Sequence, residues 1–301
     1  MYQLTFLGTA ASVPSIERNQ PGLLVTVGDK RILIDCGEGT QRQLLRSGQG
    51  FRHFHRLLLT HDHLDHILGV PGLLSTLGLQ KSDVPLLVNG GPHTLGTLTR
   101  MMAALWGECR APIPLAVAAI GAEQVIDEGD FTITCFPVWH RDTDSFGYVF
   151  EGRSRRHLSA AKLVEFGVPD GPLRGELASG RPVTLPDGRV LDPETFLGPE
   201  VPGTKLVVIG DAGSTAGLAD VAHRADALVI EATFLARDAD TARGYGHLTA
   251  AEAAQLAADA GVGRLVLTHI SGRYPPEEIL AEARRIFPET MIAADLDRLS
   301  V

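Results

Sequence analysis

The chain has 301 residues with a formal net charge of −9, and 44% of its residues are hydrophobic. This length suits one large domain or two small ones, and the acidic balance argues against a protein that coats nucleic acid with its whole surface. The three cysteines are far apart, which favours neither a disulfide framework nor a thiolate zinc site, and they are expected to be buried thiols: Cys36, Cys109 and Cys135.

No apolar run approaches the roughly 20 residues that a membrane-spanning helix needs, because glycine and proline interrupt the longest candidates. The first residues, MYQLTFLGTA, alternate like a strand and lack the basic and apolar regions of a secretory signal. We therefore expect a cytoplasmic protein without membrane association.

Short β-rich runs that end in Gly, Asp or His alternate with helical patterns along the chain. The runs include RILIDCGEGT, RLLLTHDH, FTITCFPVWH, KLVVIGDAG, ALVIEATF and RLVLTHISG. Helical patterns cover residues 38–46, 67–79, 249–260 and 276–286. This alternation predicts an α/β protein whose sheets carry helices on their outer faces.

Residues 151–200 break the alternation, because they are rich in Gly, Pro and charge. They contain one short helical pattern, LSAAKLVEFG, and a hairpin-like PVTLPDGRVL. Residues 151–189 hold seven basic and five acidic side chains, so a net-positive segment lies in an acidic chain. We predict one domain formed by residues 1–150 and 201–301, with residues 151–200 inserted into it.

Potential metal ligands stand just past the ends of several predicted strands, where α/β proteins place their functional groups. These residues are His61, His63, Asp65, His66, His140, Asp211, Glu231 and His269. Imidazole and carboxylate without thiolate suit Zn²⁺, Mn²⁺ or Fe in a catalytic site. Seven ligands from this set of eight exceed the needs of one tetrahedral ion, whereas two ions about 3.5–4 Å apart with one bridging carboxylate would use all seven.

A lone histidine at a strand end, such as His140 or His269, is more often a hydrogen-bonded structural residue than a ligand. The dense run His-x-His-x-Asp-His differs, because burying several titratable groups without a cation would be costly. This motif therefore predicts a metal site and strengthens the case for the other strand-end residues. The remaining histidines are predicted to be surface, cap or packing residues: His53, His55, His93, His157 and His223.

The motif THDHLDH, with His140, Asp211 and His269 at later positions, resembles the metallo-β-lactamase superfamily. This resemblance implies a four-layer αββα sandwich with a dinuclear zinc site. Within the superfamily, the chain is most similar to the ribonuclease Z family in its short form. The likeness covers nearly the whole chain, through FLGTAASVPS, DCGEGTQRQLL, FGY, GVPDGPL, VPGTKLVVIGDAG, EAT, GHLT and LTHISGRY.

The resemblance implies a role for each residue of the site. One zinc ion would be held by His61, His63 and His140, the other by Asp65, His66 and His269, with Asp211 bridging the two. Water held between the metals would attack a phosphodiester, because its pKa is lowered toward neutrality. Asp65 would also accept its proton, and His247, supported by Glu231, would protonate the leaving ribose oxygen.

The activity that the resemblance implies is endonucleolytic removal of 3′ trailers from precursor tRNA, which leaves a 3′-hydroxyl on the tRNA. Two alternatives stay open. One is a small-molecule phosphodiesterase or arylsulfatase of the same fold, which would tolerate loss of the inserted segment. The other is a noncatalytic metal-binding or RNA-binding protein, and the complete ligand set argues against it.

The inserted segment resembles the family's flexible arm, which clamps the tRNA elbow through its phosphates. A surface loop without that role is the alternative. Residues expected to contact tRNA are Arg18 and Asn19 in an early loop, and Arg153, Arg155, Arg156, Gly171, Pro172 and Arg174 in the arm. The resemblance further implies a homodimer in which the arm of one subunit holds the tRNA that the other cleaves.

The chain departs from the family pattern at two places. Ile230 stands where the family usually has a histidine before Glu-Ala-Thr, which predicts one polar group fewer near the leaving side. The early loop, Pro14-Ser15-Ile16-Glu17-Arg18-Asn19, lacks the lysine of the family's Pro-x-Lys-x-Arg-Asn. The family's sensing of the tRNA 3′ end through that loop therefore does not carry over residue by residue.

Overall fold

The computed structural model describes residues 1–52, 54–80, 85–107 and 111–301. The chain forms two compact units, one made of Met1–Glu151 with Thr204–Val301 and the other of Gly152–Gly203. Two of the residues named above, His53 and Cys109, lie outside the described residues. Cys36 and Cys135 are free, buried thiols, as predicted.

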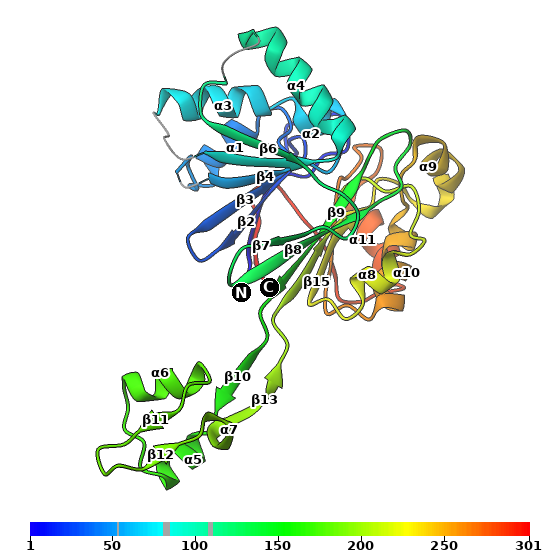
Figure 1. The fold of residues 1–301 in the computed structure, drawn as a ribbon. Helices are drawn as coiled ribbons and strands as arrows, with labels where there is room; N and C mark the ends of the chain where they lie inside the picture. Colours follow the sequence, from blue (N-terminus) through cyan, green and yellow to red (C-terminus); the bar gives the residue numbers. More distant parts are fainter. Residues whose placement is uncertain (53, 81–84, 108–110) are drawn as a thin grey trace. The chain divides into compact units, whose positions relative to one another are not determined.

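The larger unit holds two seven-stranded sheets (Figure 1). In the first sheet, the strand order is β18 (Arg298–Ser300), β1 (Gln3–Gly8), β2 (Gly22–Val27), β3 (Lys30–Ile34), β4 (Phe54–Leu58), β5 (Leu86–Gly90) and β6 (Leu115–Ala119). Strands β3 to β6 run parallel to one another, and the others pair antiparallel. Because β1 pairs with β18, the two ends of the chain lie side by side.

The second sheet combines antiparallel and parallel pairs. Its strand order is β17 (Thr290–Ile292), β16 (Leu265–Thr268), β15 (Ala227–Glu231), β14 (Lys205–Val208), β9 (Phe146–Gly152), β8 (Phe131–Pro137) and β7 (Val125–Asp127). The four strands β14 to β17 are parallel. Their carboxyl ends therefore meet at one edge of the sheet, where side chains from separate strands can converge.

Alternation of side chains along the strands produces the layers. In β1, Phe6 belongs to the apolar core that both sheets share, whereas Leu7 belongs to the core between the first sheet and its helices. In β15, Val229 faces the shared core and Leu228 faces the helices of the second sheet. Strands that are apolar on both faces need helices on the outside, which gives the four-layer αββα sandwich that the sequence predicted.

The helices cover the outer faces of the two sheets (Figure 1). The first sheet is covered by α1 (Thr40–Arg46), α2 (Leu64–Ile67), α3 (Val70–Leu79) and α4 (Pro92–Trp106), and the second by α8 (Leu218–Ala222), α10 (Ala250–Ala260) and α11 (Pro276–Arg284). A 3₁₀ turn, η1 (Ala236–Asp238), and α9 (Ala239–Tyr245) lie in the connection from β15 to α10. The helical patterns predicted at residues 38–46, 67–79, 249–260 and 276–286 correspond to α1, α3, α10 and α11.

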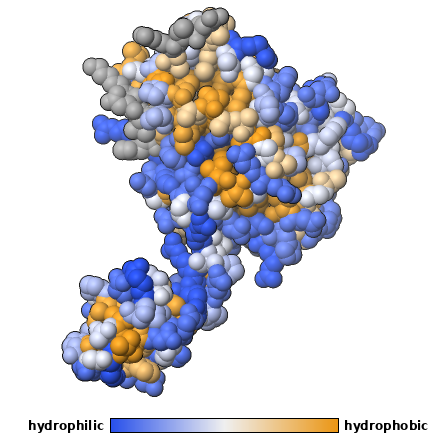
Figure 2. All heavy atoms as spheres, viewed as in Figure 1, coloured by the Kyte–Doolittle hydropathy of each residue, from blue (hydrophilic) through white to orange (hydrophobic). Residues whose placement is uncertain are grey.

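Strand β6 forms an edge of the first sheet and exposes apolar residues. Val117 of β6 and Leu105 of α4 are about half exposed, at 45% and 57%. Figure 2 shows apolar side chains gathered over α4 and β6. Within the described residues, no helix is both long enough and apolar enough to cross a bilayer.

The smaller unit, Gly152–Gly203, has an apolar core of its own. It consists of β10 (Arg155–Leu158) paired with β13 (Leu197–Val201), the hairpin β11 (Val183–Thr184) and β12 (Val190–Leu191), and the helices α5 (Ala160–Glu165), α6 (Pro172–Ala178) and α7 (Pro193–Phe196). Leu177 and Phe196 are fully buried in it. The helical and hairpin patterns of the sequence match α5 and β11–β12, whereas α6 and α7 were not predicted.

Candidate metal centre

The strand-end residues of the larger unit converge as expected from the sheet topology. His61, His63, Asp65 and His66 follow β4, whereas His140 follows β8. Asp211 comes after β14, Glu231 ends β15 and His269 follows β16. The site therefore collects its side chains from both sheets, at the carboxyl ends of their parallel strands.

The local structure after β4 explains the spacing of the histidine motif. His63 is the N-cap of the short helix α2, which turns the chain so that Asp65 and His66 follow at helical positions. The turn is held by the backbone of a neighbouring loop, because Cys36 N–H donates to His66 O over 2.7 Å. A Cβ at Gly69 would come 2.0 Å from Gly37 O, so only glycine allows this close approach at the end of the motif.

Asp211 lies at the centre of the site with its two carboxylate oxygens facing different histidines. Oδ2 is 3.7 Å from His61 Nε2 and 3.8 Å from His140 Nε2. Oδ1 is 3.4 Å from His66 Nε2 and 3.1 Å from His269 Nε2. A carboxylate that divides its oxygens between two groups of imidazoles has the arrangement expected of a ligand shared by two cations.

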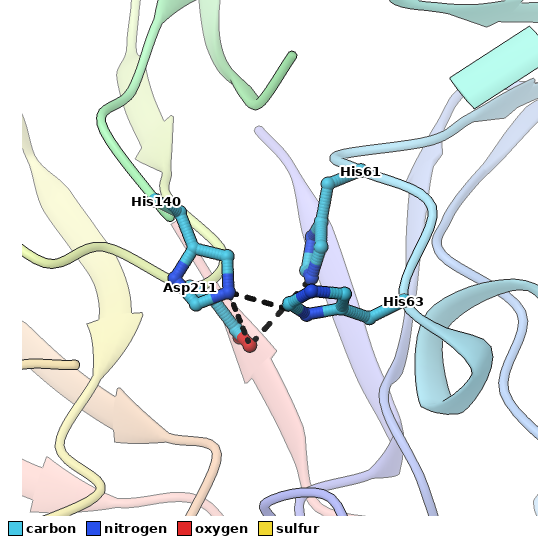
Figure 3. Close-up of side chains that lie close together, drawn as sticks. All are labelled: His61, His63, His140 and Asp211. Carbon is cyan, nitrogen blue, oxygen red and sulfur yellow. Dashed lines mark hydrogen bonds and ion pairs between the residues drawn. The ribbon is translucent and has the colours of Figure 1, made fainter. Parts of the chain in front are cut away.

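The potential ligands form two main groups around Asp211. In the first, His61, His63, His140 and Asp211 each offer an atom within 4.8 Å of the others, and Figure 3 shows these side chains pointing toward one another. In the second, Asp65 Oδ2 lies 3.6 Å from Nε2 of both His66 and His269. A third grouping joins Asp211 and His269 to His247.

Several of these atoms lack the hydrogen-bond partner that a buried polar atom needs. Among the described residues, buried side-chain atoms without a partner include His61 Nε2, His66 Nε2, Asp211 Oδ1 and His269 Nε2. Buried polar groups are normally satisfied, because leaving one unpaired costs on the order of 1–3 kcal/mol. Four such atoms gathered around the carboxylate of Asp211 fit bound cations, and together with the fold they indicate metal binding.

The other ring nitrogens of the histidines are held by protein groups. His66 Nδ1 lies 2.7 Å from Asp35 Oδ2, His61 Nδ1 lies 3.0 Å from Thr60 Oγ1, and His140 Nδ1 lies 2.7 Å from Gly246 O. Partners of this kind fix the orientation of a ligating imidazole and leave its Nε2 for the metal. Asp35 also accepts hydrogen bonds from the amide and hydroxyl of Thr60, both over 2.8 Å.

The surroundings of His61 and His66 shift the pKa values of these two histidines in opposite directions. Burial, and then repulsion from His66, keep the pKa of His61 well below its usual value, so this ring is neutral, as a ligand must be. Burial also disfavours the charged form of His66, but the carboxylates of Asp211 and Asp35 outweigh it and raise the pKa of His66 well above the usual value. Negative charge therefore collects around the second group, where a cation would replace a proton.

His247 and Glu231 form a hydrogen-bonded pair beside this cluster. His247 Nδ1 lies 2.9 Å from Glu231 Oε1, and the other oxygen of Glu231 accepts from Thr233 Oγ1 over 2.6 Å. Burial opposes protonation of His247, but the charge and hydrogen bond of Glu231 prevail and raise the pKa of His247 to about 9. The imidazole therefore carries a proton at neutral pH and holds it next to the cluster.

The side chain of Ile230 belongs to the apolar core and not to the polar groups of the site. Its side chain is fully buried in the core between the second sheet and its helices. Alternation along β15 puts Glu231 on the other face, toward Asp211 and His247. The isoleucine therefore contributes to packing, and the absence of one polar group near the leaving side stays a prediction.

The polar residues of the early loop make hydrogen bonds within the larger unit. Arg18 Nη1 donates to Thr9 Oγ1 over 2.6 Å and to Ala293 O over 2.7 Å. Asn19 Nδ2 donates to Glu38 O over 2.8 Å. These bonds hold the loop in place, and Ser12 N–H in the same loop donates to Asp65 Oδ2 over 3.1 Å.

The residues predicted to contact tRNA from the insertion lie in the unit Gly152–Gly203. Arg156 and Arg174 are ion-paired within it, to Glu194 and Asp170.

Of the histidines taken as structural, His55 lies 2.9 Å from the carboxylate of Glu128 and His93 lies 3.3 Å from that of Asp62.

Sequence reasoning missed Asp35, Thr60 and Thr233, which hold the site residues in place. Asp35 follows directly after β3 in the run RILID, so its position at a strand end was the available signal. Its backbone has a φ of 57°, which is uncommon for a residue other than glycine and which no sequence pattern announced.

Comparison with known proteins agrees with this fold and cluster. The sequence model described as "Beta-lactamase superfamily domain" matches residues 30–167 and 181–270. The chain is 65% identical to a protein named ribonuclease Z from Bradyrhizobium diazoefficiens, over the full length of both. It is 41% identical to ribonuclease Z from Gemmatimonas aurantiaca, over 96% of this chain and 93% of the relative.

A solved structure leads to the same family. The crystal structure of human tRNase Z, short form, matches with a TM-score of 0.70 and 25% identity, over 99% of this chain and 98% of that one. The chain therefore belongs to the ribonuclease Z family of the β-lactamase superfamily. Both the predicted fold class and the family resemblance are confirmed.

Proposed function

We propose that this chain is a metal-dependent endoribonuclease that removes 3′ trailers from precursor tRNA and leaves a 3′-hydroxyl on the tRNA. The ribonuclease Z relatives support the reaction and its substrate. The observation that carries the proposal is the position of Asp211, whose two oxygens face separate groups of histidines beside the hydrogen-bonded pair of His247 and Glu231.

We propose that the centre holds two Zn²⁺ ions, and Mn²⁺ or Fe would suit the same ligands. One ion would be held by His61, His63 and His140, the other by Asp65, His66 and His269, with Asp211 shared. When bound, two such ions supply a nucleophilic water at neutral pH and neutralise charge on the phosphoryl oxygens.

The chain's own residues move the protons. Asp65, the more accessible carboxylate of the centre, accepts the proton of the nucleophile, and the amide of Ser12 holds it in place through Oδ2. His247 carries a proton at neutral pH and gives it to the leaving 3′-oxygen of ribose. Glu231 keeps the imidazole protonated and fixes its orientation through the bond to Nδ1.

We propose that the unit Gly152–Gly203 binds tRNA through its phosphates, because the stretch 151–189 has seven basic and five acidic side chains in an otherwise acidic chain, and basic side chains suit a polyanion. Arg153, Arg155, Arg156, Gly171, Pro172 and Arg174 remain the predicted contacts there, and Arg18 and Asn19 those of the early loop. The supporting feature is the segregation of the unit, since every proposed metal ligand lies in the larger unit.

A homodimer in the cytoplasm completes the proposal. The cytoplasmic location rests on the proposed substrate, because the enzyme has to be in the same compartment as precursor tRNA. Dimerisation is supported by exposed apolar residues such as Val117 of the edge strand β6 and Leu105 of α4, which offer surface for a second copy. Light scattering on the eluting protein measures the mass, and a Val117→Lys variant should shift it toward the monomer.

The direct test is incubation with a precursor tRNA labelled at its 5′ end and, separately, at its 3′ end. We expect one endonucleolytic cut at the base of the trailer, a 3′-hydroxyl on the tRNA product, and loss of cleavage on treatment with a chelator. Hydrolysis of nitrophenyl phosphodiesters without any cleavage of precursor tRNA would instead favour the small-molecule phosphodiesterase or arylsulfatase.

A further inference from the structure

Two large aromatic side chains are exposed beside the metal centre. Trp139, immediately before His140, is 58% exposed, and Tyr245, two residues before His247, is 54% exposed. Aromatic side chains usually bury most of their area, since they are the largest apolar groups of a protein. Neither ring has a role in the chemistry proposed above, so their position needs a separate explanation.

Trp139 is held on one face only. Its carbonyl accepts the amide of Gly213 over 2.8 Å, which fixes the backbone next to the loop that carries Asp211. A Cβ at Gly213 would come 2.1 Å from Cζ3 of the indole, so the ring lies directly on this glycine. One side of the indole is therefore supported by the Asp211–Gly213 loop, and more than half of the side chain stays open to a ligand.

Gly213, on which the Trp139 ring lies, is also close to the loop that carries His247. The same Cβ at Gly213 would lie 3.0 Å from the carbonyl carbon of Gly246. The carbonyl oxygen of Gly246 faces His140 Nδ1 over 2.7 Å, and the rings of His140 and His247 are 5.1 Å apart. Trp139 therefore lies on the side of the site that carries His247, the proposed acid for the leaving oxygen.

A positive charge accompanies the indole. Arg141, on the other side of His140, is exposed, and its aliphatic stem packs so close to Gly246 that a Cβ there would come 2.6 Å from Cγ. Its guanidinium makes no hydrogen bond or ion pair with the part of the chain that the structure describes. Its φ of 48° is rare for a residue other than glycine, and such backbones concentrate at functional sites.

We propose that Trp139 stacks on the unpaired base of the nucleotide that carries the leaving 3′-oxygen, and that Arg141 pairs with a phosphate next to it. This inference rests on the proposed function and deepens it by assigning a nucleobase subsite. Aromatic rings bind single-stranded nucleic acid by stacking on bases, and an adjacent cation tracks the backbone. Because every base has a π-face, such a subsite binds the tRNA end without specificity for one base.

Tyr245 differs from Trp139 in what its ring contacts. Its ring is stacked against Phe234 at 6.3 Å with an interplanar angle of 8°, and Phe234 also carries the guanidinium of Arg273 at 5.7 Å. Phe234 lies 6.2 Å from the ring of His247. The Tyr245 ring is therefore part of the packing behind His247, and the stacking role falls to Trp139.

The test is a cycle of two changes, one in the protein and one in the RNA. Trp139→Leu keeps an apolar side chain on Gly213 but removes the stacking plane, and Trp139→Tyr restores a plane. The RNA is a precursor tRNA with or without the base on the nucleotide just 5′ of the cut. On the intact RNA, Trp139→Leu should lower kcat/KM by about 5- to 150-fold, the range expected for one stacked base.

On the abasic RNA, intact protein and Trp139→Leu should cleave at nearly equal rates, and Trp139→Tyr should recover most of the loss on intact RNA. Metal content and hydrolysis of bis(nitrophenyl) phosphate should stay unchanged in both variants. Arg141→Gln should lower the slope of log affinity against log salt by about 0.7, the value for one phosphate of a single strand.

Two results would overturn this inference while leaving the proposed function intact. One is equal cleavage of intact precursor tRNA by Trp139→Leu and the unchanged protein. The other is a loss in Trp139→Leu that is just as large on abasic RNA or on the small phosphodiester, which would make the indole a packing residue for the Asp211 loop. Failure of the unchanged protein to cut any precursor tRNA would instead reject the proposed function.

Discussion

The metal centre and the unit Gly152–Gly203 use their polar side chains in opposite ways. In the centre, His61, His66 and Asp211 are buried, neighbours hold one ring nitrogen of each histidine, and His61 Nε2, His66 Nε2 and Asp211 Oδ1 stay without a hydrogen-bond partner. In the smaller unit, charges such as Arg181 and Arg189 are more than half exposed and pair with nearby acids across the surface.

This difference corresponds to two roles, reaction chemistry and contact with a phosphate backbone. Reaction chemistry needs atoms held within a few tenths of an ångström, which buried and multiply bonded groups provide. Contact with a phosphate backbone needs charge at roughly the right place, and exposed side chains on long stems can adjust to it. Substitutions in the centre should therefore have large effects on all substrates, whereas changes in the smaller unit should affect only tRNA.

The largest effect should come from Asp211→Ala. Because both carboxylate oxygens face histidines of separate groups, its loss removes a shared ligand and leaves those imidazoles facing one another. Cleavage of precursor tRNA and of nitrophenyl phosphodiesters should fall to background, and elemental analysis should find less metal per chain. Full metal occupancy in this variant would contradict the bridging role.

His247→Ala should have the next largest effect, and one that depends on the leaving group. A ribose alkoxide needs a proton, so cleavage of precursor tRNA should slow by about 10²–10⁴-fold, the usual worth of a general acid. A nitrophenyl phosphodiester needs little protonation and should lose far less. Equal losses on both substrates, measured as kcat, would remove His247 from the role of acid.

Asp35→Asn should weaken metal binding without abolishing it. The variant keeps the shape of the residue but replaces the charged oxygen that holds His66 Nδ1, and changes of such partners typically cost about 10–100-fold in metal affinity or activity. Competition with a chelator measures the affinity. The matched control is Asp29→Asn, the same change at an exposed turn, which should leave it unaltered.

The parts of this account that the sequence could predict are those that periodicity and strand ends encode. The α/β class followed from apolar strands such as β14 and β15, and the candidate ligands from residues that stand just past strand ends, whereas the four-layer sandwich and the division of the ligands between two ions came from the family resemblance. Asp35 was missed because an aspartate after a strand also fits an ordinary turn. Nothing in the sequence shows that its side chain reaches back to Thr60 and His66.

The sequence was less informative about the smaller unit and the early loop. The segment GPLRGELASG resembles a loop because of its glycines, yet Pro172 begins α6, as proline at a first helical position often does, and Leu177 fills the core. The tRNA contact of Arg18 stays a prediction. Its hydrogen bonds to Thr9 and to the carbonyl of Ala293 were not predicted, because they join residues that are separated in the sequence. Tertiary hydrogen bonds of this kind leave no periodic pattern.

The most direct test of the division between the two regions is to excise the smaller unit. Glu151 pairs with Lys205 across β9 and β14, and a Cβ at Gly203 would come 2.0 Å from Gly152 O. Residues 153–202 can therefore be replaced by a short Gly/Ser linker without moving either strand.

The shortened enzyme should keep its metal content and its hydrolysis of a small phosphodiester, while kcat/KM for precursor tRNA falls steeply, mainly through a higher KM. The salt dependence of tRNA binding should also decrease, because fewer phosphates are neutralised. If the shortened enzyme processed precursor tRNA as well as the intact enzyme at matched salt, the smaller unit would not be the tRNA-binding arm and the separation of roles would be wrong.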